Sequence, residues 1–169
     1  MIRVIVVSAL LGLVGYSALA QTENARSIPA CGSPSGPAFV GDWLRLPVPQ
    51  KAILRKGKDV DYQSYSIGFG QKKDRFWLWG GFGPTWSSGQ VSIKLKESST
   101  SFTEINWTFA DSKLGGGVDA KGKLKNGNFW RYFGIPGETL KYEDVSKDAA
   151  EYFDSIINNI CYRKPKWAR

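Results

Sequence analysis

The Asn126-Gly127 dipeptide is the feature that most restricts the fold of this chain. It stands between two runs, Val118–Lys125 and Asn128–Ile135, in which apolar and polar residues largely alternate. Asn-Gly between alternating runs is a strong signal for a β-hairpin with a two-residue type I′ turn, because both residues tolerate positive φ. The sequence therefore predicts an antiparallel hairpin centred on this dipeptide.

The register of that hairpin decides which side chains share a face. A two-residue turn pairs Lys125 with Asn128 and places Leu124 beside Phe129 on an apolar face. Arg131 falls on that same apolar face, which is an unfavourable position for a charge unless it lies at the sheet margin or the register bends there. The opposite face is predicted to present alternating lysines beside two aromatic residues, and these are our candidate ligand-binding residues: Lys121, Lys123, Lys125, Trp130 and Tyr132.

Two further strand pairs precede this hairpin in the sequence. The first pairs Tyr62–Phe69 with Arg75–Phe82 across a polar turn, and the second pairs Val91–Lys96 with Phe102–Phe109. These runs are rich in β-branched and aromatic residues and are bounded by turn residues, as strands usually are. Together with the central hairpin, they predict a largely antiparallel sheet.

The first of these pairs carries Trp77 and Trp79 on one face. Its loop length sets a register in which Phe69 lies opposite Phe76 on the other face. We expect the C-terminal helix to bury the two tryptophans, because large aromatic side chains mostly form cores. An exposed platform for sugar rings is the alternative.

An amphipathic helix is predicted near the C-terminus. Ser146 is a good N-cap, and the segment Lys147–Tyr162 carries apolar residues at helical spacing: Ala149, Ala150, Phe153, Ile156, Ile157 and Ile160. Because the apolar face of a helix must be covered, we expect an α+β fold with about five to seven largely antiparallel strands packed against this helix. A β-barrel or sandwich with an appended helix is the alternative, since local hairpins suit it equally.

The N-terminus has the composition of a secretory signal peptide. Residues 1–20 combine a basic start, an apolar run and a small-residue cleavage pattern at Ala18–Ala20. The apolar run is too short for a membrane-spanning helix, so the mature chain is predicted to contain no transmembrane segment. We therefore expect a secreted or periplasmic protein, with an extended lead-in over residues 21–38 and one globular domain over residues 39–169.

The two cysteines, Cys31 and Cys161, are predicted to form a disulfide bond, because two cysteines in an exported protein most simply pair. A bridge leaves no thiol to act as a nucleophile or zinc ligand. The chain has no histidine, so the commonest general base and metal ligand is also missing. We predict no cofactor and no metal site.

Carboxylates are the remaining groups that could carry catalysis. Five of them stand near predicted strands or ahead of the helix: Glu104, Asp111, Glu138, Glu143 and Asp144. Glycoside hydrolysis needs two carboxylates within roughly 5–9.5 Å of each other, and the sequence sets no such distance. Surface solvation explains these residues more simply, so no catalytic residue is assigned.

The net charge of +8 favours anionic partners, although it also serves solubility. We expect a non-catalytic domain that binds a ligand or partner, such as an anionic polymer or surface or another exported protein. A carboxylate-dependent glycan hydrolase is one alternative, and a structural protein that adheres to anionic cell-surface polymers is another. We find no specific nucleic-acid motif.

Overall fold

The computed structural model describes residues 26–32, 38–40, 43–49, 52–57, 64–70, 76–82, 93–135 and 138–164. The predicted signal peptide lies outside the described residues, as does most of the predicted lead-in. Within these ranges, no helix has the length and apolar character needed to cross a membrane.

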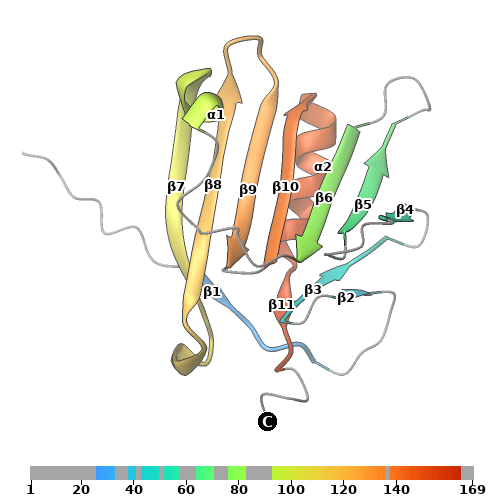
Figure 1. Cartoon of the computed structure of the whole chain (residues 1–169), viewed down its shortest axis with the longest axis vertical. Helices are drawn as coiled ribbons and strands as arrows, with labels where there is room; N and C mark the ends of the chain where they lie inside the picture. Colours follow the sequence, from blue (N-terminus) through green and yellow to red (C-terminus); the bar gives the residue numbers. More distant parts are fainter. Residues whose placement is uncertain are drawn as a thin grey trace, which may run out of the picture.

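The fold is built on an eight-stranded sheet with the order β1-β7-β8-β9-β10-β6-β5-β4 (Figure 1). All neighbours are antiparallel except β1 and β7, which are parallel. Its strands are β1 (Arg26–Ile28), β4 (Ile53–Lys56), β5 (Ser64–Phe69), β6 (Phe76–Phe82), β7 (Ser99–Phe109), β8 (Gly116–Leu124), β9 (Phe129–Ile135) and β10 (Glu138–Val145). The predicted antiparallel sheet is confirmed, with more strands than expected.

A second sheet and three short helical segments complete the described structure. The sheet has the order β11-β3-β2, with β2 (Ala38–Val40), β3 (Leu44–Pro47) and β11 (Cys161–Tyr162). The helices are α1 (Ile93–Glu97), the 3-10 turn η1 (Ser112–Leu114) and α2 (Lys147–Asn158). A carboxylate joins the two sheets, because the buried Glu138 of β10 accepts hydrogen bonds from the backbone N–H groups of Trp43 and Leu44 at 2.6 and 3.0 Å.

Helix α2 packs on one face of the large sheet, as predicted (Figure 1). Ser146 caps it by accepting a hydrogen bond from the backbone N–H of Ala149. Its predicted apolar residues are all buried, and Phe153 packs edge-on against Phe69 of β5. The helix ends before the predicted Tyr162, because Tyr162 pairs with Leu44 in the small sheet.

The predicted disulfide is present. Cys31 and Cys161 are bonded across a sequence separation of 130 residues. The bridge joins the segment after β1 to β11, directly beyond the end of α2. Backbone hydrogen bonds reinforce this junction, since Cys31 N–H donates to Tyr162 O at 2.8 Å and Tyr162 N–H donates to Pro29 O at 2.9 Å.

The central hairpin lies where the sequence predicts it, but the predicted register is wrong by one residue. The connection has three residues, because Leu124 N–H donates to Asn128 O and Gly127 N–H donates to Leu124 O. Gly127 has a φ of +92°, and Asn126 is not among the residues with positive φ. This is a type I turn followed by a left-handed glycine, the usual form of a three-residue hairpin loop.

The extra loop residue exchanges the two faces of β9 relative to β8, because side chains alternate with a period of two. Lys123 pairs with Phe129, and Lys121 pairs with Arg131. The lysines therefore lie on the same side as Arg131, towards α2. Trp130 and Tyr132 lie on the other side, so the five candidate residues do not share a face.

Trp130 and Tyr132 instead form a second core on the face away from α2. Trp130 is fully buried, Tyr132 is 5% exposed, and they pack with Val118, Ala120, Leu124 and the partly buried Leu95. Trp130 donates to Ser99 Oγ at 2.7 Å. Gly122 leaves room for the indole, because a Cβ atom there would lie 2.8 Å from Trp130 Nε1.

The prediction of a strand over Val91–Lys96 is wrong for the described residues of that segment. Residues 93–97 form α1, and Ser98 N–H closes the turn by donating to Lys94 O at 3.0 Å. Residues 91 and 92 lie outside the described ranges. Lysine, leucine and glutamate are good helix formers, and this helix lets Leu95 cover the second core.

The predicted pairing of β5 with β6 is confirmed, with Phe69 opposite Phe76. The predicted burial of Trp77 under α2 is wrong, because Phe69 contacts α2 and Trp77 occupies the alternate side of the sheet. Trp77 is half-buried and lies under the guanidinium of Arg55, 4.5 Å from the ring centroid. The side chain of Trp79 lies outside the described set.

The docking of α2 can be tested at Ile156, which is 2% exposed. Replacing Ile156 by Ala is expected to lower the free energy of unfolding by about 2–5 kcal/mol, because it removes buried methylene groups and leaves a cavity. Urea unfolding followed by circular dichroism measures this change. As a control, Ile53→Ala on β4 removes an isoleucine that is 39% exposed, and it should change the free energy by about 0.5 kcal/mol or less.

Candidate functional site

An open hollow of about 240 Å³ lies where α2 meets the β1, β7 and β8 side of the sheet. Four of its seven lining residues are ionisable. The lining comprises Arg26, Thr103, Ile105, Asp119, Lys121, Arg131 and Asn158. We call this surface the hollow.

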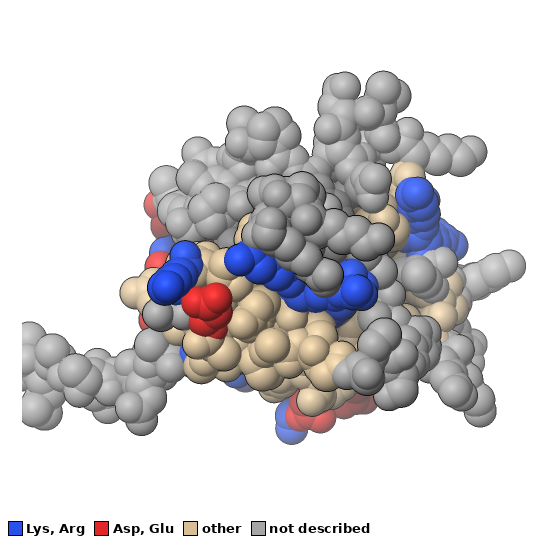
Figure 2. All heavy atoms as spheres, turned by 90° about the horizontal axis from the view of Figure 1, so that it is seen from below, with Lys and Arg blue, Asp and Glu red and all other residues tan. Residues whose placement is uncertain are grey.

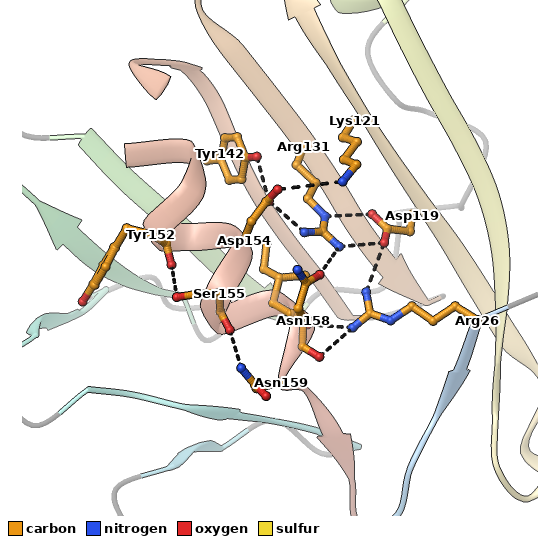
Figure 3. Close-up of polar contacts among 11 residues, drawn as sticks. Arg26, Asp119, Lys121, Arg131, Tyr142, Tyr152, Asp154, Ser155, Asn158 and Asn159 are labelled. Atoms are coloured by element: carbon orange, nitrogen blue, oxygen red, sulfur yellow. Dashed lines mark hydrogen bonds and ion pairs between the residues drawn. The ribbon is translucent and has the colours of Figure 1, made fainter. Parts of the chain in front are cut away.

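Arg131 forms the back of the hollow and is only 2% exposed. Its Nε and Nη2 donate to the two carboxylate oxygens of Asp119 at 2.9 and 2.7 Å, which makes a two-pronged ion pair between β9 and β8 (Figure 3). Its Nη1 donates to Asp154 Oδ1 on α2 at 2.7 Å. One buried guanidinium thus ties two strands to the helix.

Two further groups complete the polar contacts of this network. Asn158 Oδ1 accepts from Arg131 Nη2 at 3.1 Å, and the hydroxyl of Tyr142 donates to Asp154 Oδ1 at 2.8 Å. Burial alone would lower the pKa of Arg131, but Asp119 and Asp154 outweigh it and raise the pKa above its usual value. Burial, with the charge of Asp154 second, raises the pKa of Tyr142, which keeps its hydroxyl a donor.

Arg26 closes one side of the hollow and connects β1 to the same network. Its Nη1 donates to Asp119 Oδ2 at 3.2 Å, and its Nη2 donates to the carbonyl oxygens of Ile157 and Asn158 at 3.0 and 3.2 Å. Such carbonyls at a helix C-terminus have no partner within the helix and attract cations. Burial lowers the pKa of Arg26, although Asp119 opposes that shift.

Lys121 is the most accessible cation of the hollow. Its side chain is 54% exposed, and its ammonium nitrogen is 3.9 Å from Asp154 Oδ2, which is a long and weak ion pair. Together with Asp154, the hollow contains three cationic side chains and two carboxylates, so one positive charge is left over. Thr103 and Ile105, on the neighbouring strand β7, provide a mixed polar and apolar wall.

The structure thus places only one of the five predicted site residues in the hollow, namely Lys121. Lys123 lies on the same side of β8, with its ammonium 5.9 Å from the centroid of Phe129, and Lys125 lies in the exposed turn. Sequence reasoning missed Arg26, Asp119 and the other lining residues. The sequence signal for these residues was Arg131, because a charged residue predicted on an apolar face needs a buried partner of opposite charge.

The carboxylates considered for catalysis do not line the hollow. Each has a local partner: Glu138 holds backbone amides, Glu104 pairs with Lys96 at 2.6 Å, and Glu143 pairs with Lys141 at 3.0 Å. Asp144 accepts hydrogen bonds from Asn126 and Asn128, which lower its pKa in that order. Asp111 accepts from the backbone N–H of Lys113.

Positive charge is not confined to the hollow. Seen from below, several Lys and Arg side chains lie along the surface with small acidic areas between them (Figure 2). A general attraction of the surface for anions can therefore be distinguished from a specific anion site by comparing substitutions of lysines inside and outside the hollow.

Comparisons with protein-family models, with curated proteins and with solved structures give no match to this chain.

The importance of the buried ion network can be tested by removing its centre. Arg131→Met is expected to lower the free energy of unfolding by about 3–5 kcal/mol, because it takes the guanidinium away from the buried Asp119 and the partly buried Asp154. Tyr142→Phe removes one hydrogen bond from an uncharged hydroxyl to the Asp154 carboxylate and should lower it by about 1.5–3 kcal/mol. Urea unfolding of both variants measures the two losses in free energy of unfolding. Equal losses would contradict the central role given to Arg131.

Proposed function

We propose that this chain is an exported, non-catalytic binding protein that holds an acidic group of its ligand in the hollow. The observation that carries the proposal is the exposed side chain of Lys121, which is weakly paired and lines the same concave site as Arg26, a site with an excess of positive charge. A carboxylate, sulfate or phosphate group would neutralise that excess.

The size of the hollow supports recognition of one part of a larger ligand. Sites that enclose a small molecule are usually about 300–1,000 Å³ and are largely apolar. At about 240 Å³, the hollow is smaller, and six of its seven lining residues have polar or charged side chains, although apolar atoms supply most of its accessible surface. It suits a single charged group on a ligand whose remainder lies on the neighbouring surface.

The state of Asp119 argues for binding rather than glycan hydrolysis. A hydrolase needs one carboxylic acid that donates a proton and a second carboxylate that acts as base or nucleophile. Both oxygens of Asp119 already accept hydrogen bonds from Arg131, and Oδ2 also accepts one from Arg26. Both oxygens of this carboxylate are thus engaged by guanidinium groups rather than open to a ligand, so its role here is to position the arginines.

The proposal is tested by measuring the binding of dextran sulfate to the mature protein, with uncharged dextran as the ligand control. Lys121→Gln is expected to weaken binding by about threefold to tenfold, and binding should weaken as salt rises. Lys94→Gln is the matched control, because it removes the same charge from the exposed surface of α1 and should change the affinity by less than about twofold.

Equal losses in the two lysine variants would show that dextran sulfate responds only to net charge. That outcome would favour a protein that adheres to anionic surfaces without a defined site, and the hollow would then have no special role.

A further inference from the structure

Among the described residues, strand β7 has a long stretch with a partner on one side only. It is 11 residues long and pairs with β8 along nearly its whole length. On its other side, β1 pairs only with Trp107–Phe109. Within the described part of the chain, no other strand pairs with β7, and Figure 1 shows its upper part at the margin of the sheet.

The backbone groups that face this open edge can be identified from the ladder. Phe109 N–H donates to Gly115 O in the turn before β8, whereas Ala110 N–H donates to Ile28 O of β1. Successive residues of a strand point their N–H and C=O groups to opposite sides. The even-numbered residues Phe102, Glu104 and Asn106 therefore direct theirs away from β8.

In the part of the chain that the structure describes, this edge lacks the usual protection against pairing. Natural edge strands carry lysine, proline or inward charges, or they are short. Residues 99–109 contain no lysine and no proline, and the single charge, Glu104, is paired with Lys96. Phe102 is 49% exposed, which adds an apolar contact on the face away from α2.

We propose that β7 accepts an extended acidic peptide segment as an added antiparallel strand, with acidic side chains directed into the hollow. This inference rests on the proposed function and specifies its ligand as polypeptide. Thr103 and Ile105 line the hollow, so residues of an added strand opposite them face it as well. Arg26 of β1 lies on the same side of β7 as the added strand, whereas Lys121 lies on β8, on the opposite side of β7.

The alternation of side chains along β7 also determines which residue types the added strand should carry at alternate positions. Residues opposite Phe102, Glu104 and Asn106 exchange backbone hydrogen bonds with β7 and turn their side chains to the face where Phe102 is exposed. Those positions favour apolar residues, and the alternate positions favour acidic ones. Charge complementarity with the hollow and the exposed Phe102 together select an alternating acidic and apolar strand.

A capped peptide, Val-Glu-Val-Glu-Val-Glu-Val, is the probe. Methylating the backbone nitrogens of the valines removes the N–H groups that would face β7, and it should weaken binding by about tenfold or more. Methylating the backbone nitrogens of the glutamates leaves the N–H groups that face β7 unchanged, and it should change the affinity by less than about threefold. The peptide with Lys in place of Glu should bind at least about tenfold more weakly, because it opposes the charge of the hollow.

Amide hydrogen exchange provides the site-specific readout. The amides of Phe102, Glu104 and Asn106 should exchange fast in the free protein and slow with peptide bound, whereas the amides of Thr103 and Ile105 should be slow in both. Slow exchange of the even-numbered amides without peptide would show that the chain itself or a second copy occupies the edge, and it would overturn the proposal.

The outcomes separate this inference from the proposed function. If dextran sulfate binds through Lys121 but both methylated peptides bind as well as the unmethylated one, strand addition is wrong and the anion site stands. If neither dextran sulfate nor the acidic peptide binds, the proposed function itself fails.

Discussion

A guanidinium that is almost fully buried must keep its charge and find acceptors for each of its three nitrogens, and the region around Arg131 is organised by that requirement. Asp119 on the neighbouring strand and Asp154 and Asn158 on α2 supply those acceptors. Apolar contacts tolerate small sliding motions, whereas these hydrogen bonds do not, because each has a narrow range of distance and angle. The network therefore sets where α2 lies on the sheet, and the hollow exists because the helix lies there.

The sequence contains enough information to predict the position of the central hairpin, but its register depends on the rest of the fold. Asn-Gly is compatible with a two-residue loop and also with a three-residue loop that ends in a left-handed glycine. The second form buries Trp130 and brings Arg131 to Asp119. Hydrogen bonds from Asn126 and Asn128 to Asp144 of β10 hold the loop in that form. These contacts are distant in sequence, so local turn preferences do not reveal them.

Features that depend on nearby residues were predicted well. The β5–β6 register follows from a short polar turn, and α2 follows from its N-cap and its apolar spacing. The candidate site was predicted poorly because it is assembled from remote segments: Arg26 and Asp119 are 93 residues apart. The parallel pairing of β1 with β7 that brings them together leaves no periodic signal in three residues. The placement of α1 was missed for a related reason, since a five-residue segment with alternating apolar residues fits either a strand or a helix.

The disulfide has a mechanical consequence. Seven of the eight strands of the large sheet lie between Cys31 and Cys161, and only β1 precedes the first cysteine. A pulling force applied to the chain before Cys31 and after Cys161 would pass through the covalent bridge and bypass the 130-residue loop. Such a load can peel β1 from β7, but it cannot unravel the other strands while the bridge is intact. A protein tethered at both ends in a turbulent or contractile setting would keep the rest of its large sheet folded under tension.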